Sequence, residues 1–174
     1  MNRRALYFIL AVAAQLLILA AVPAQKIYTR STGRSVTLKM RPIDPYSVLS
    51  GYYVTLHYEI SDPSQFANPG DSYISGERIY AILERQNDGV WRPVSLSKSR
   101  PTNLPDNRIA IRGRYTYAFI EYGIEEFFIP EDKRAEIEQG LRKNLDQARV
   151  EIKVDSKGDA ALARLLIGDH VYDY

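Results

Sequence analysis

Serine and lysine are the first residue types in this chain that could carry out chemistry. Ser47 and Ser50 lie beside Gly51, and a serine nucleophile with a buried, deprotonated lysine as its base would make a hydrolase. The Ser-Met-x-Pro context of such nucleophiles is absent, and the lysines lie in polar stretches of sequence. We therefore interpret both serines as turn residues and keep an anchored hydrolase as the alternative function.

Histidine and glutamate offer a second kind of chemistry. The chain has two histidines, His57 and His170, without the short spacing that zinc sites use, so we expect no metal and no other cofactor. Glu125 and Glu126 are adjacent, so on a strand they would point to opposite faces and could not form an acid–base pair by themselves. Alternatively, these two glutamates belong to a structural turn or to the edge of an interface. These candidate residues favour a protein that is not an enzyme, and they leave the question of enzymatic activity open.

The element that must position His57 is a strand that follows a turn. Asp44 and Pro45 are typical of a turn, and Gly51 supplies backbone freedom before the strand. From residue 52 to 59 the side chains alternate, which predicts a half-buried strand. One face would carry Tyr52, Val54, Leu56 and Tyr58, and the other Tyr53, Thr55, His57 and Glu59.

Two segments are candidate interaction surfaces. The first is the face of this strand that carries Tyr53, Thr55 and His57. The second runs from Tyr122 to Phe128 and has more aromatic residues than an exposed strand keeps without a partner. Its candidate contact residues, with His57, are Tyr122, Gly123, Glu125, Glu126 and Phe127. Core packing is the alternative for both segments, and for Phe127 it is the favoured one.

The stretch from Gly51 to Tyr58 resembles the signature of the GDYXXLXY family of bacterial proteins. The match holds at Gly51, Tyr53, Leu56 and Tyr58 and fails at Tyr52, where the family has aspartate. Further likeness lies in residues 79–91, in residues 122–131 and in the C-terminal hairpin, and together these span about residues 34–168. The resemblance implies a membrane-anchored extracytoplasmic domain with no established reaction, often encoded beside multi-spanning membrane proteins.

An uncharged, apolar run of eighteen residues, 5–22, contains one polar residue, Gln15. As a helix it would rise about 27 Å, close to the hydrocarbon thickness of a bilayer. We predict an uncleaved anchor over residues 1–24, with a signal peptide ending near Ala24 as the alternative. Arg3 and Arg4 favour a cytoplasmic N-terminus, although basic residues also follow the run. We expect residues 25–33 to be a linker.

Residues 34–174 are expected to form one α+β domain. The chain has 23 basic and 21 acidic residues, so it lacks the positive electrostatic field that is typical of a nucleic-acid binder. The absence of cysteine excludes disulfides. Alternating segments predict a mainly antiparallel sheet, with bends or bulges near Gly113 and Gly123. A helix over Glu131–Gln147 carries a narrow apolar stripe for docking on this sheet, and Gly140 within it indicates close packing.

These observations together predict an accessory protein. A single membrane-spanning helix would hold the domain at the outer side of the plasma membrane, with the lipid bilayer contacting residues 5–22. The domain would bind or stabilise a membrane protein partner, with a multi-spanning protein as the expected kind. We expect no nucleic acid among its partners.

Overall fold

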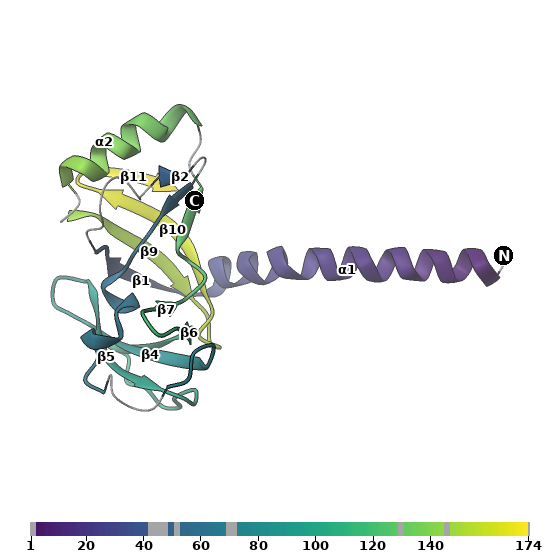
Figure 1. Ribbon diagram of the computed structural model, residues 1–174, viewed down its shortest axis with the longest axis horizontal. Coiled ribbons are helices and arrows are strands. Elements are labelled where there is room, and N and C mark those ends of the chain that lie inside the picture. The colour runs from purple at the N-terminus through teal and green to yellow at the C-terminus, as the bar shows by residue number, and fades with distance from the viewer. Residues whose placement is uncertain are drawn as a thin grey trace.

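The computed structural model describes residues 3–41, 49–50, 53–68, 73–128, 131–144 and 147–173. It consists of a long N-terminal helix, α1 (Arg3–Thr32), that projects from a β-rich domain (Figure 1). The predicted α+β class, with an antiparallel sheet domain after one N-terminal helix, is confirmed. The predicted turn at Asp44 and Pro45, Ser47, and the signature residues Gly51 and Tyr52 lie outside the described residues.

The described strands form three antiparallel sheets. The first has the order β1-β9-β10-β11, the second β5-β4-β6-β7 and the third β2-β3-β8. Their bounds are β1 Arg34–Lys39, β2 Leu49–Ser50, β3 Tyr53–Thr55, β4 Arg78–Arg85, β5 Trp91–Ser97, β6 Arg108–Tyr115, β7 Ile120–Glu121, β8 Glu126–Phe128, β9 Arg149–Val154, β10 Ala160–Ile167 and β11 His170–Asp173. Short 3-10 helices cover Glu59–Ser61 (η1), Pro63–Gln65 (η2) and Glu131–Lys133 (η3).

One hydrophobic core lies between these sheets. Every sheet contributes to it, for example through Val36 of β1, Leu83 of β4 and Phe127 of β8, each with at most 1% of its surface exposed. A parallel bridge between Thr37 and Val90 connects the first two sheets. Gly89 and Gly158 adopt positive φ values, 79° and 88°, in the turns of the hairpins β4–β5 and β9–β10.

The predicted second helix is shorter than expected. The helix α2 covers Arg134–Asn144 and follows η3, and residues 145 and 146 lie outside the described part of the chain. Ile137 and Leu141 are buried, so the apolar stripe docks as predicted. A Cβ atom built on Gly140 would lie 3.3 Å from Cγ2 of Ile167, which confirms close packing against β10.

Residues 25–33 do not form the expected linker. They form the end of α1 and its junction with β1. The helix continues to Thr32 because its last part docks against the domain. Gln25 donates to Asp159 over 2.8 Å, and the 1%-exposed Thr29 donates to Asp155 over 2.9 Å. Gly33 has no room for a side chain, since a Cβ atom there would lie 2.4 Å from the carbonyl oxygen of Thr29.

Two further predictions about strands are wrong. The ladder between β4 and β6 runs through Gly113 without a bulge, and this glycine makes room for the side chains of Ile120 and Tyr122 instead. The strand expected over residues 52–59 is regular only in β3, and Glu59 already belongs to η1. The bend predicted at Gly123 is confirmed, since its φ of 72° separates β7 from β8.

Candidate interaction groove

The two segments that the sequence singles out are neighbours in space. In the third sheet, β3 pairs with β8 in antiparallel register, so that Thr55 is opposite Glu126. Beyond the strand, the amide of Leu56 donates to the carbonyl of Glu125 over 2.6 Å. The signature segment and the segment Tyr122–Phe128 therefore form one structural unit, although about seventy positions of sequence separate them.

The inward side of this unit is buried in the core. Leu56 and Tyr58 are both fully buried, which confirms the face that alternation predicts for them. The Tyr58 hydroxyl donates to the carbonyl of Ile124 over 2.5 Å and thus ties the end of the signature to the facing turn. A bridge to Met40 holds Tyr58 on its other side.

A second buried tyrosine makes the reciprocal contact. The hydroxyl of Tyr122 donates to the carbonyl of Ile60 over 2.6 Å. Burial raises the pKa of Tyr58 and of Tyr122 well above the usual value, and the nearby charge of Glu125 adds to the effect. Both phenols are therefore neutral hydrogen-bond donors near pH 7 and neither is available as a nucleophile or base.

Glu125 shapes the turn between β7 and β8. Its carboxylate accepts from the amide of Tyr122 over 2.5 Å and from the amide of Ile124 over 2.9 Å, and so closes the turn around Gly123. Because Glu125 lies in this turn and precedes β8, its side chain reaches the same surface as that of Glu126. Opposite faces were expected only if both glutamates lay on a strand, and β8 begins at Glu126, so the alternative interpretation of Glu125 as a turn residue is confirmed.

The outward side of the unit lines an open groove of about 690 Å³. Thr55 and His57 form one wall, and Glu126 and Phe128 extend it along β8. The opposite wall comes from the second sheet and its connection to the turn. The remaining lining residues are Arg114, Phe119, Glu121, Gly123 and Glu125.

The groove combines acidic and aromatic side chains. One basic residue, Arg114, faces three acidic ones, Glu121, Glu125 and Glu126, so the lining carries a net charge of 1 − 3 = −2 with His57 neutral. Burial lowers the pKa of His57, and the charge of Glu125 opposes this in part, so the imidazole is neutral at pH 7. Phe119 and Phe128 add apolar surface, with 44% and 54% of their area exposed. Such a lining suits a segment with a cationic and an apolar side chain.

The groove begins at the foot of α1. Lys26 of this helix donates to the carbonyl of Gly123 over 3.0 Å and to the carbonyl of Ala160 over 2.9 Å. The first of these carbonyls belongs to the turn that lines the groove. The projecting helix and the groove are thus connected directly, with no spacer between them.

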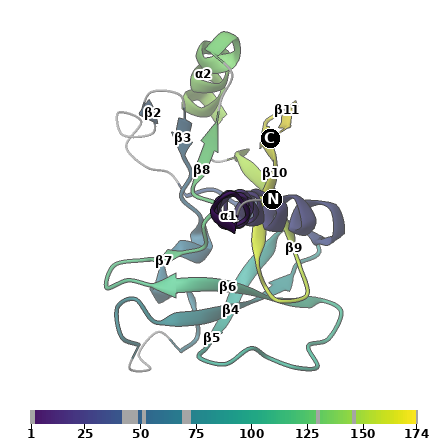
Figure 2. The same cartoon turned by 90° about the vertical axis from the view of Figure 1, so that its right-hand side faces the viewer.

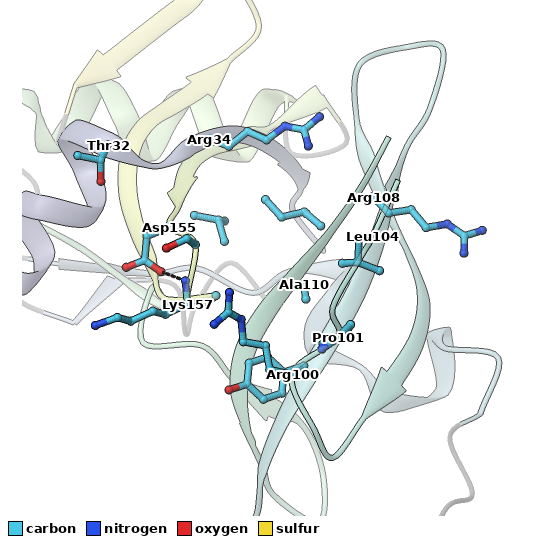
Figure 3. A pocket seen from close by; sticks show the side chains of 14 residues that line it. Thr32, Arg34, Arg100, Pro101, Leu104, Arg108, Ala110, Asp155 and Lys157 are labelled. Carbon is cyan, nitrogen blue, oxygen red and sulfur yellow. Dashed lines mark hydrogen bonds between the residues drawn. The ribbon is translucent and has the colours of Figure 1, made fainter. Parts of the chain in front are cut away.

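A second hollow, of about 310 Å³, lies between the β9–β10 hairpin with the end of α1 on one side and the second sheet with the loop before β6 on the other. Four basic residues line it, but Figure 3 shows that the side chains of Arg34 and Arg108 point away from Asp155. Arg34 lies over the ring of Trp91, and Arg108 forms an ion pair of 2.8 Å with Glu84. These charges do not converge on a common point, so the groove is the stronger candidate site.

The structure divides the predicted contact residues into two groups. His57, Gly123, Glu125 and Glu126 line the groove. Tyr122 and Phe127 are only 6% and 1% exposed and belong to the core, which confirms the core packing favoured for Phe127 and removes Tyr122 from the candidate interaction surface. Both side chains point inward because the turn at Gly123 and the pairing of β8 with β3 place alternate residues on opposite faces.

Some groove residues could not be found from local patterns. Arg114, Phe119 and Glu121 come from β6, β7 and their connection, and only the tertiary fold brings them opposite β3. His170, the other histidine, lies elsewhere, 3.9 Å from Glu136 of α2. Among the described residues, no three histidine, aspartate or glutamate side chains gather as metal ligands would.

The arrangement defines a class of protein, a β-rich domain carried by a long apolar helix with an acidic, aromatic groove at the junction. The model of the family described as GDYXXLXY protein matches residues 15–165, which is most of the chain. The chain belongs to the GDYXXLXY family. No curated protein and no solved structure matches it.

Proposed function

We propose that the protein is a membrane-anchored accessory module that holds a membrane protein partner in the groove outside the cytoplasm. The apolar part of α1 supports the anchor. Between Leu6 and Thr32 the helix is long and apolar enough to cross a bilayer, and its most apolar window is 0% buried against the domain. A helix that is apolar all round and has no protein cover is typical of a membrane span.

One observation carries the proposal, the pair of hydrogen bonds from Lys26 to Gly123 and Ala160. Through these bonds the helix holds the groove at a set position next to the bilayer surface. A groove in that position meets segments that leave the membrane, which are the exposed parts of multi-spanning proteins. Basic residues flank the apolar run on both sides, so the outward orientation of the domain is supported instead by the export-like Val22-Pro23-Ala24 that ends the run.

The anchor and its orientation are tested on intact cells and membranes. Carbonate washing should leave the protein in the membrane at the mass of the full chain. A reporter fused after Tyr174 that is active only in the cytoplasm should stay silent. Release into the wash, with Gln25 as the first residue, would contradict the anchor, and a strongly active reporter would contradict the orientation.

The accessory role is tested by the size of the complex in mild detergent. In native gels the wild-type protein should migrate in a complex larger than its own 19.9 kDa chain and detergent allow. Glu126→Lys, which changes an exposed groove residue, should shift it to the free form. Asp169→Lys is the matched control, because Asp169 is exposed and outside the groove lining. Free wild-type protein, or equal loss in both variants, would overturn the role.

The hydrolase alternative has one observation in its favour, because His57 and Glu125 line the same groove. The neutral imidazole could act as a base, but both carboxylate oxygens of Glu125 accept from backbone amides. The side chain of Ser50 lies outside the described part of the structure, as does Ser47. Ester or peptide hydrolysis by the purified protein that His57→Gln abolishes would favour the enzyme.

A further inference from the structure

Gln15 is the one polar residue in the uncharged run 5–22 and lies near its middle. Its side chain is exposed and is not covered by the domain. In hydrocarbon, an amide without a hydrogen-bond partner costs several kcal/mol, so polar side chains at that depth usually face another protein segment. Gln15 therefore marks the side of α1 on which to look for a neighbour.

Helix geometry places Gln15 on the side of α1 that docks with the domain. Gln15 and Lys26 are eleven positions apart, which at about 100° per residue is roughly 20° more than three full turns. Thr29, fourteen positions from Gln15, is about 40° short of four turns. Lys26 and Thr29 both bond to the domain, so Gln15 lies above the same docking side of the helix.

The depth of Gln15 in the bilayer is consistent with the same arrangement. Eleven residues of helix rise about 16 Å, which is close to half of a hydrocarbon thickness of about 30 Å. When Lys26 is at the bilayer surface, Gln15 is thus near the midplane. In Figure 2, which looks along α1 from its N-terminal end, β9 and β10 lie on one side of the helix, and β7 and β8 lie on the other. The turn that joins them, at Gly123, receives the hydrogen bond from Lys26.

We infer that the Gln15 side of α1 and the groove form one continuous docking surface for a membrane-spanning helix of another protein. This inference rests on the proposed function and names the partner's chemistry. At mid-depth the partner helix carries a side chain that hydrogen-bonds with the Gln15 amide. Where it leaves the membrane, it continues into a segment with a lysine or arginine and an apolar residue, which fit three carboxylates, Phe119 and Phe128.

A second copy of this chain fits the surface less well. Two glutamine amides can bond to each other, and parallel copies would meet at the same depth. Packed helices are about 8–10 Å apart, however. Strands lie on several sides of α1 in the view along the helix (Figure 2), so two parallel copies packed through Gln15 would bring both domains into the same space.

Site-specific photo-crosslinking in the full-length protein tests this inference. The residue p-benzoylphenylalanine is placed singly at Leu19, at Leu17 or at Phe128, in growing cells. Leu19 is on the Gln15 side of α1 and Leu17 on the opposite side, and their exposed fractions, 74% and 72%, are matched. Phe128 reports on the groove, where it is 54% exposed. Each probe is combined with Gln15→Leu, and with Gln15→Asn as the conservative variant.

The expected result is one membrane protein, identical by mass spectrometry, crosslinked from Leu19 and from Phe128 but not from Leu17. Gln15→Leu should lower both yields by about threefold to thirtyfold, the range for one hydrogen bond between membrane helices, and Gln15→Asn should restore them.

Three results would overturn the inference. Equal crosslinking from Leu17 and Leu19 would mean that no side of α1 is selected. A product of twice the chain mass would mean that a second copy occupies the surface. Crosslinking from Phe128 alone, insensitive to Gln15→Leu, would remove α1 from the surface and leave the proposed groove function intact. The absence of crosslinks from all positions would overturn both proposals together.

Discussion

Neighbouring residues of the signature segment have opposite surroundings. Leu56 and Tyr58 have no exposed surface, and the Tyr58 hydroxyl is bonded to the carbonyl of Ile124. Thr55 and His57 alternate with them and line the groove. The same few residues of chain thus serve the core on one side and an open, acidic and aromatic surface on the other.

This difference separates the residues that mark the family from those that could carry its function. Leu56 and Tyr58 are named positions of the GDYXXLXY signature, and they hold two distant segments of the chain together. Thr55 and His57 are at its unnamed positions, marked X. We therefore expect Leu56 and Tyr58 to determine stability, and Thr55 and His57 to determine what the groove binds.

The largest expected effect is from Leu56→Ala. Because Leu56 is fully buried, its truncation should lower the free energy of unfolding by about 2–5 kcal/mol. Urea unfolding of the detergent-solubilised protein, followed by the fluorescence of the single, 3%-exposed Trp91, measures this change. Thr55→Ala on the other side should remain within about 0.5 kcal/mol of wild type. A reversed order would contradict the assignment of the two sides.

A smaller loss is expected from Tyr58→Phe. This change keeps the ring and removes the donor to the Ile124 carbonyl, so a buried acceptor loses its partner at a cost of about 1–3 kcal/mol. Tyr117→Phe is the control, because Tyr117 is 85% exposed and should show no measurable change. Equal stability of both variants in urea would mean that the Tyr58 hydroxyl does not hold the turn.

Alkaline pH should weaken the same contacts. The pKa values of Tyr58 and Tyr122 are raised in the folded state, mainly by burial, so the folded protein retains protons that the unfolded chain loses above about pH 10. Stability should therefore be independent of these groups below that pH and fall above it, by about tenfold in the unfolding equilibrium per pH unit for each phenol. Urea midpoints between pH 8 and 11 measure the fall. A slope in Tyr58→Phe as steep as in wild type would exclude Tyr58 as a source.

The smallest effect on stability is expected from His57→Gln, which changes the groove alone. It should leave the unfolding free energy within about 0.5 kcal/mol of wild type, since His57 is exposed. The same variant should reduce the amount of complex in native gels. Normal complex formation with a large loss of stability would place His57 with the structural residues.

Local patterns in the sequence predict the parts of the fold that depend on local periodicity. The alternation through Leu56 and Tyr58 identifies the buried side, and the spacing of Ile137 and Leu141 identifies the docked side of α2. The Asp-Gly pair at positions 88 and 89 is typical of a hairpin turn, and Gly89 has the positive φ that such a turn uses.

Long-range contacts account for what the sequence did not predict. Nothing local indicates that Thr55 pairs with Glu126, and this pairing decides which of the groove residues are exposed. The pairing also buries Tyr122 and Phe127, whose composition alone is compatible with a surface. Likewise, the helix persists through residues 25–32 because Thr29 bonds to the turn between β9 and β10 and Lys26 bonds to β10, and the composition of residues 25–33 does not indicate these contacts.

Cysteine labelling tests directly whether alternate residues of the signature segment serve the core and the groove. The chain has no cysteine, so single cysteines at positions 55, 56, 57 and 58 can be labelled with a polar maleimide in the native protein. The account predicts rapid labelling of Thr55→Cys and His57→Cys, and labelling of Leu56→Cys and Tyr58→Cys only after urea unfolding. Native membranes should slow the labelling at 55 and 57 relative to purified protein, because a partner covers the groove. Rapid native labelling at 56 and 58 with protection at 55 and 57 in the purified protein would contradict the account.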